Sequence, residues 1–78
     1  MRMYLVNKRM EMNYSQRKVA RIAGVSYQHY SKIESGERGK NVSLMVVARI
    51  AEALEIPLEE LYFLERIYQE EMEFNNEL

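Results

Sequence analysis

Residues 15–36 (SQRKVARIAGVSYQHYSKIESG) contain two short helical patterns joined by a turn centred on a glycine. Ser15 and Ser26 each precede one pattern, where a serine hydroxyl can accept a hydrogen bond from a free N–H of the first helical turn. Gly24 can adopt the left-handed conformation that ends a helix, and Ala20 is small enough to let two backbones cross closely. The segment therefore predicts two short helices held at a crossing.

Apolar side chains of the same segment are expected to fix this crossing. They are Val19, Ile22, Val25, Tyr30 and Ile33. Two short helices that cross in this way form the layout of a helix-turn-helix, whose second helix enters the major groove of DNA.

Further pieces of sequence stand in order around this segment. The set comprises Arg9, Ser15-Gln16, Ala20, Gly24-Val25-Ser26, Ile33-Glu34-Ser35-Gly36 and Ile50-Ala51-Glu52-Ala53-Leu54. On these residues the chain resembles the XRE family of helix-turn-helix proteins, which includes phage Cro and lambda-type repressors, over roughly residues 5–63. The resemblance implies an all-α, lambda-repressor-like fold of five helices, with the helix-turn-helix in the second and third.

Helix periodicity and capping residues predict where the five helices lie. The expected ranges are about Arg2–Met12, Gln16–Ala23, Tyr27–Ser35, Leu44 to Leu54 and an extended fifth helix from Leu58 to about Glu73, followed by a frayed end. Ser43 is the expected cap of the fourth helix, and residues 36–42 form a polar loop. We expect one domain, residues 1–78, because a chain of this length has only a marginal core.

The net charge of −1 hides an uneven distribution along the chain. Residues 1–40 carry nine Lys or Arg against three Glu, a balance of +6, whereas residues 41–78 carry two against nine, a balance of −7. A molecule with one basic and one acidic pole suits docking of one face on an anionic surface. The acidic half has a second interpretation, as an ordinary solvated helix surface.

Composition argues against several kinds of site. The chain has no Cys and no Asp, and His29 is its only histidine, so a metal site and a hydrolytic triad lack their usual residues. We expect no metal, no cofactor and no enzymatic activity. Because no apolar run is long enough for a signal peptide or a membrane span, we expect a cytoplasmic protein without a membrane partner.

The second helix of the motif supplies the expected base contacts. At 100° per residue, Tyr30 and Ile33 share one side of this helix. Gln28 and Lys32 fall almost opposite, where they are either base contacts or ordinary surface residues. Glutamine suits paired hydrogen bonds to adenine, and lysine donates to guanine acceptors. The expected base-contact residues are Gln28, Lys32, Tyr27 and Ser31.

Phosphate contacts are expected around this helix. Gln16 begins the preceding helix, where free N–H groups and the helix dipole attract phosphate, and the resemblance implies the same role for it. The other candidates lie on the two motif helices and the loop that follows them: Arg17, His29, Arg38, Lys40 and Asn41.

The resemblance also implies an ion pair between Arg9 and Glu34, which would tie the recognition helix to the first helix. Truncating one partner of a well-buried pair costs about 3–5 kcal/mol. Together with Ala20 and Gly24, these residues are expected to shape the fold and to make no contact with DNA.

The fifth helix carries two apolar stripes. Leu61, Leu64, Tyr68 and Met72 form one stripe, which suits a core. Phe63, Ile67 and Phe74 form a second stripe, and a small domain that exposes such a patch needs a partner. We therefore expect the helix at about residues 58–73 to form a homodimer through the second stripe. The alternative is that Phe63 merely covers the fourth helix and that the tail beyond Met72 is disordered.

These patterns predict a DNA-binding transcriptional regulator that acts as a homodimer on a palindromic stretch of double-stranded DNA. Three alternatives remain open. The chain is similar in size to controllers of restriction–modification operons, and it could be an antitoxin whose acidic C-terminal half binds a protein partner. It could also be a protein-interaction module that no longer reads DNA, although the basic first half argues against this.

Overall fold

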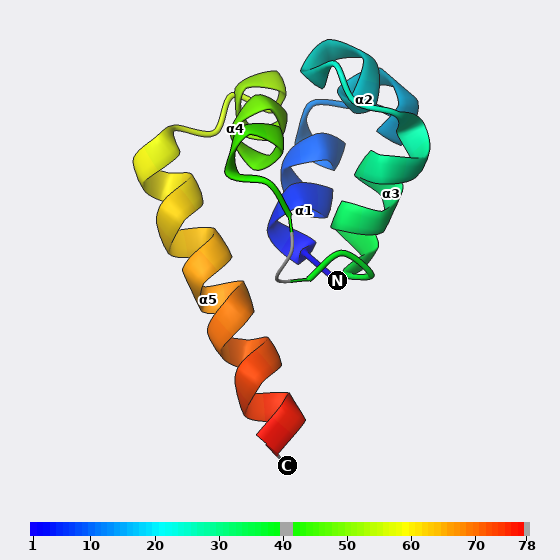
Figure 1. The fold of residues 1–78 in the computed structure, drawn as a ribbon. Coiled ribbons are helices and arrows are strands. Elements are labelled where there is room, and N and C mark those ends of the chain that lie inside the picture. Colours follow the sequence, from blue (N-terminus) through cyan, green and yellow to red (C-terminus); the bar gives the residue numbers. More distant parts are fainter. Residues whose placement is uncertain (40–41, 78) are drawn as a thin grey trace.

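The computed structural model describes residues 1–39 and 42–77, without the side chains of residues 75–77, and over this part of the chain it contains helices and no strands. The helices are α1 (Met3–Glu11), α2 (Gln16–Ala23), α3 (Tyr27–Ser35), α4 (Leu44–Ala53) and α5 (Leu58–Glu77). Figure 1 shows α3 and α5 on opposite sides of the molecule, with α1 and α4 between them. The expected five-helix, all-α fold is confirmed.

Serine caps and left-handed glycines set the limits of the central helices. The hydroxyls of Ser15, Ser26 and Ser43 accept a hydrogen bond from the N–H three residues later, at 3.0, 3.0 and 3.4 Å. Gly24 and Gly36 end α2 and α3 with φ values of 74° and 94°. Because these signals are local, the predicted limits of α2 and α3 are correct to the residue.

The outer helices differ from the prediction at their ends. Helix α1 is one residue shorter at each end, since Arg2 and Met12 are its flanking caps. Helix α5 continues to Glu77, four residues beyond the predicted end and into the segment that was expected to fray. Its sequence contains neither Gly nor Pro after Leu58, so nothing local stops the helix.

The core is formed where α2 packs against α3 and α4, and where α4 packs against the start of α5. Val19, Tyr30 and Ile33 are fully buried, as predicted, and Val25 is partly buried against the same core. Ala20 is buried at the crossing. The remaining large members of the core come from the other helices: Leu5, Ile50, Leu54, Ile56 and Leu61.

The prediction for Ile22 is wrong, because this side chain is 50 % exposed. The buried side of α2 is centred on Val19, Ala20 and Ala23. At 100° per residue, Ile22 lies about 100° from the centre of that side. It lines a shallow surface depression with Arg49 and Glu52 of α4 instead of filling the crossing.

Helix α5 has the two stripes that its periodicity predicts. Leu61 and Tyr68 of the first stripe are buried, and Leu64 and Met72 are half-buried. Phe63, Ile67 and Phe74 of the second stripe are 58 %, 53 % and 61 % exposed. Within the described residues the second stripe is therefore largely exposed, apart from an edge contact between the Phe63 and Tyr62 rings at 5.4 Å. This exposure does not fit the alternative that Phe63 covers α4.

Candidate nucleic-acid interface

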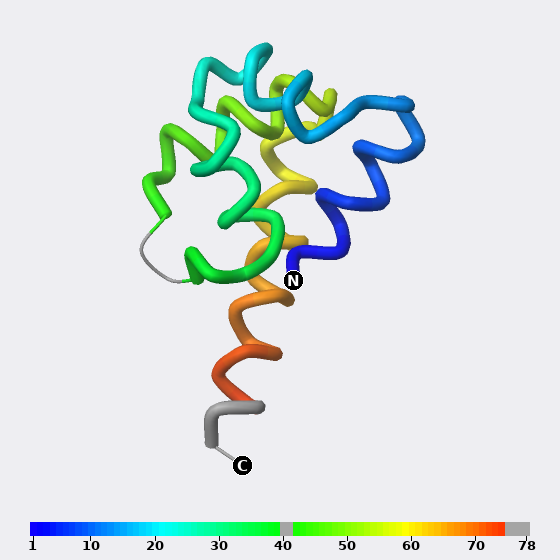
Figure 2. The backbone as a smooth tube through the Cα atoms, turned by 90° about the vertical axis from the view of Figure 1, so that its right-hand side faces the viewer, coloured from blue at the N-terminus to red at the C-terminus, as the bar shows by residue number. Residues whose placement is uncertain are grey.

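Helix α3 is held on one side and presents the other to solvent. Tyr30 and Ile33 are fully buried, whereas Gln28 and Lys32 are exposed. Tyr27, His29 and Ser31 are half-buried at the edges of the exposed side. In Figure 2 this helix faces the viewer and α5 lies behind it, so none of the other described helices lies in front of α3.

A cluster around Glu34 fixes the buried side of α3. The Glu34 carboxylate accepts two hydrogen bonds from Arg9, at 2.9 and 3.0 Å, and one from the Tyr30 hydroxyl at 2.5 Å. Gln16 donates a fourth through its amide nitrogen, at 2.8 Å. The Arg9–Glu34 ion pair is present as expected, and it joins α1, α2 and α3 through one buried carboxylate.

This environment keeps Glu34 ionised. Burial alone would raise the pKa of its carboxyl, but hydrogen bonds from Arg9, Tyr30 and Gln16 outweigh burial and hold the pKa below its usual value. Burial and the bond to this carboxylate raise the pKa of the Tyr30 hydroxyl, so Tyr30 remains a donor. At neutral pH the cluster therefore holds a charged Glu34 carboxylate to which Arg9, Tyr30 and Gln16 all donate.

Gln16 and Arg17 lie at the start of α2, next to the start of α3. One amide hydrogen of Gln16 is used by Glu34, which orients the side chain and leaves its second amide hydrogen for another acceptor. The Arg17 guanidinium stacks on the Tyr27 ring, with its carbon 4.3 Å from the ring centre. The structure therefore brings together two predicted phosphate contacts and one predicted base contact.

The loop after α3 carries Arg38, whose side chain is exposed. Its backbone N–H donates to the carbonyl of Lys32 in the last turn of α3, at 3.1 Å, so the loop folds back on the helix end. Two other predicted phosphate contacts, Lys40 and Asn41, lie outside the described residues.

Sequence reasoning missed a second buried cluster, which is centred on Arg2. This side chain is fully buried, and all five of its N–H groups are used. Two bonds of 2.9 Å run to the carboxylate of Glu65 in α5. Three more, of 2.6 to 2.8 Å, run to the carbonyls of Ile33, Arg38 and Gly39.

The position of Glu65 was the one available signal for this cluster. At 100° per residue from Leu58, Glu65 falls within about 20° of Met72 in the core stripe of α5, where a lone carboxylate needs a partner. Nothing in the sequence marks Arg2 as that partner, because the two residues are 63 positions apart.

The two clusters correct the charge argument. Arg2 and Arg9 belong to the basic half, but the half-buried Glu65 and the buried Glu34 neutralise them. Lys8 pairs with Glu11 at 3.8 Å. The exposed basic residues of the described part of this half lie on α2, α3 and the following loop: Arg17, Lys18, Arg21, Lys32 and Arg38. The basic surface is smaller than the sequence indicates, and it is concentrated on the motif.

The described residues support neither a metal site nor a membrane span. No group of three His, Cys or acidic residues is placed to hold a metal ion there. None of the helices in residues 1–39 and 42–77 is both long and apolar enough to cross a membrane.

Comparison with known proteins gives one result. A family model described as helix-turn-helix matches residues 5–61, which run from α1 into the first turn of α5. Searches of curated proteins and of solved structures found no match. The matched segment covers most of the chain and includes the whole helix-turn-helix, and the chain therefore belongs to the Cro/C1-type helix-turn-helix family, the XRE family, as a DNA-binding regulator domain.

Proposed function

We propose that this protein is a sequence-specific transcriptional regulator that binds a palindromic operator in the cytoplasm as a homodimer, with α3 of each subunit in the major groove. The observation that carries the proposal is the exposure of Gln28 and Lys32 on a helix whose opposite side is buried. An exposed polar face on a firmly held helix is what base readout needs.

Gln28 and Lys32 are the proposed base-reading residues, and Tyr27 and Ser31 reach the edges of the same groove. The glutamine amide can bond adenine at two positions, and the lysine can donate to guanine acceptors. Each such contact contributes about 1–3 kcal/mol of discrimination against the wrong base.

The proposed phosphate contacts surround α3. Gln16 and Arg17 lie at the start of α2, where backbone N–H groups favour an anion. Arg38 extends from the loop after α3, and His29 lies at the edge of that helix. Lys40 and Asn41 complete the proposed set on sequence grounds. Arg9, Glu34, Ala20 and Gly24 are assigned to holding the motif together, and not to DNA.

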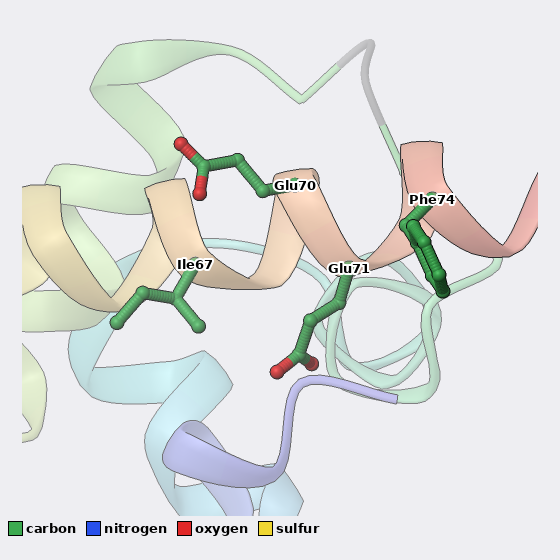
Figure 3. Close-up of a pocket in the computed structure, with 4 residues that line it drawn as sticks. All are labelled: Ile67, Glu70, Glu71 and Phe74. Atoms are coloured by element: carbon green, nitrogen blue, oxygen red, sulfur yellow. The ribbon is translucent and has the colours of Figure 1, made fainter.

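The proposed dimer forms through α5. Phe63, Ile67 and Phe74 are exposed on this helix, and burying them against a second copy would remove apolar surface from water. Figure 3 views α5 from outside the molecule, with Ile67 and Phe74 directed to one side of the helix. Both flank a shallow depression of about 390 Å³ that Glu70 and Glu71 also line.

A second candidate for the dimer surface is the groove between α4 and α5. It has a volume of about 710 Å³, and its exposed apolar residues are Leu44, Met45, Leu58 and Tyr62. Leu44 is 83 % exposed. A two-fold axis that directs both α3 helices at one DNA duplex must pass beside them. The start of α4 lies at the side of the molecule in Figure 2, where such an axis can pass, whereas the stripe lies on the helix opposite α3. This geometry favours the groove over the stripe as the dimer surface.

A second candidate activity is binding of a basic protein partner through the acidic half, as in an antitoxin. The observation that favours it is that Glu71 and Glu70, the latter paired with Arg66 at 2.9 Å, line one depression with the exposed Ile67 and Phe74. Such a surface combines apolar contact with negative charge, which suits a basic partner.

Selection of bound sequences from a random DNA pool tests the proposed function. We expect enrichment of a two-fold symmetric site whose half-sites lie about one helical turn, 34 Å, apart. Enrichment of a single half-site would contradict the dimer and leave the proposed base readout by α3 intact. If no sequence is enriched and DNA binding is weak and independent of salt, the proposed function as a DNA-binding regulator is contradicted. Such a result would favour a protein-interaction module.

A further inference from the structure

The Arg2 cluster joins three parts of the molecule that are far apart in sequence. The Arg2 side chain binds Glu65 of α5 and the carbonyls that end α3 and form its following loop. Its backbone N–H donates to the carbonyl of Glu34 at 2.8 Å. The start of the chain, the C-terminal end of α3 and the middle of α5 therefore meet at one guanidinium.

Glu65 is itself held from several sides. The Tyr4 hydroxyl donates to it at 2.6 Å, and the Gln69 amide donates to it at 2.8 Å. Burial alone would raise its pKa, but hydrogen bonds from Arg2, Tyr4 and Gln69 lower the pKa overall, so the carboxylate stays charged. The Tyr68 ring covers the Arg2 guanidinium at 4.5 Å. The cation thus has a fixed place and orientation.

The loop after α3 takes its shape from this cation. Carbonyls of Arg38 and Gly39 point inward to Arg2, and Gln69 adds a bond of 3.0 Å to the Gly39 carbonyl. The loop also packs tightly, because a Cβ at Gly36 would lie 2.9 Å from the Tyr68 hydroxyl. Without Arg2 the part-buried Arg38 carbonyl loses its donor, while Gln69 still binds the Gly39 carbonyl. A carbonyl without a donor is costly, so we expect loss of Arg2 to release the loop at Arg38.

The residue whose carbonyl binds Arg2 also carries an exposed cationic side chain. The Arg38 carbonyl accepts a hydrogen bond of 2.6 Å from the Arg2 guanidinium, while the Arg38 side chain lies in solvent beside α3. Fixing the backbone of Arg38 fixes the point from which its guanidinium extends.

We propose that Arg2, anchored by Glu65, is a positioning residue for DNA binding: it sets the loop after α3 so that Arg38 reaches a backbone phosphate. This inference rests on the proposed function, and it adds a specific task for a side chain that never touches DNA.

The variant Arg2→Lys tests the proposal, because it keeps the charge and removes most of the N–H donors to the loop. We expect affinity for the selected operator to fall about tenfold, as for loss of one charge-assisted contact. The slope of log K against log salt should become shallower by about 0.9, the value for one phosphate. Both quantities are measured by fluorescence anisotropy at a temperature where circular dichroism shows a folded protein.

Two controls separate positioning from general stability. Tyr4→Phe removes one hydrogen bond to the same Glu65 carboxylate and none to the loop. It should therefore lower the melting temperature and leave the salt slope unchanged. In an Arg38→Ala background, Arg2→Lys should cost less than about twofold in affinity, because the side chain that it positions is gone.

If Arg2→Lys does not fold, Gln69→Met replaces it. This change keeps the Arg2–Glu65 pair and removes the bonds that Gln69 donates to the Gly39 carbonyl and to Glu65. It should give a smaller loss of affinity that again disappears in the Arg38→Ala background.

Additive losses from the Arg2 and Arg38 changes, or a parental salt slope in Arg2→Lys, would overturn the positioning role and leave the proposed function intact. A parent protein that enriches no DNA sequence would overturn the proposed function, and this inference with it.

Discussion

Glu34 shows at the scale of one residue how the recognition helix is held. Its carboxylate accepts bonds from α1, α2 and its own helix, and its side chain is 3 % exposed. Gln16 takes part in this cluster and also belongs to the proposed phosphate contacts. The group that holds α3 is therefore linked to the edge of the proposed DNA surface.

Removing one partner of the Arg9–Glu34 pair should destabilise the fold. We expect Arg9→Ala or Glu34→Ala to cost about 3–5 kcal/mol in free energy of unfolding, because a buried charge loses its partner. Chemical denaturation measures this cost. DNA binding at a temperature where the variant is folded should remain near that of the parent, and unchanged stability would show that the pair does not carry this role.

Exposed residues of α3 should behave in the opposite way. Gln28→Ala and Lys32→Ala are each expected to cost about 1–3 kcal/mol of binding to the best operator, and to relax preference at one base pair. Their melting temperatures should stay close to the parent's, since both side chains point away from the core. Operator binding as tight as that of the parent would place base readout elsewhere.

The two glutamates paired with Arg9 and Arg2 predict how stability depends on pH. Folding lowers the pKa of Glu34 and of Glu65, so the stability that they contribute is complete above the usual glutamate pKa of about 4.3. It is lost as the pH falls through their lower folded-state values. The melting temperature should therefore drop below about pH 4.5. Glu65→Gln should start from a lower melting temperature and show a smaller drop, measured by circular dichroism over a pH series.

At the scale of elements, α5 presents two apolar surfaces, and a matched pair of variants tells them apart. Phe63→Glu with Ile67→Glu is expected to give a folded monomer with weaker operator binding, because charges in the stripe oppose its burial. Sedimentation at micromolar concentration measures the oligomeric state. The matched variant Leu44→Glu with Tyr62→Glu places two charges in the α4–α5 groove. A monomer from this second variant alone would move the interface to the groove.

The helix-turn-helix was predictable because its signals are local. Serine caps and left-handed glycines act within one helical turn, and periodicity alone separates the two stripes of α5. Ile22 was misplaced because it lies just past the edge of the buried side of α2, where only the angle to α4 decides exposure. The Arg2–Glu65 pair depends on how α5 docks beside the first residues of the chain, which no local pattern encodes.

At the scale of the whole molecule, the proposed reading face and the proposed dimer helix lie apart. Helix α3 is at one side and α5 at the other (Figure 1). Because Arg2 and Arg9 are paired with Glu65 and Glu34, the exposed basic residues in the described part of the first half lie on α2, α3 and the loop. Electrostatic attraction to DNA is therefore expected at the motif, while Glu71 on α5 and the Arg66–Glu70 pair add no net positive charge to that helix.

The anchoring of the α3 loop to α5 limits the operators that the proposed dimer can tolerate. With α5 fixed in the dimer and the end of α3 tied to α5 through Arg2, the two subunits cannot turn freely toward displaced half-sites. One inserted base pair turns a half-site by about 34–36° around the duplex, since B-DNA has about 10–10.5 base pairs per turn. A single insertion or deletion between the half-sites should therefore weaken binding far more than the loss of one base contact.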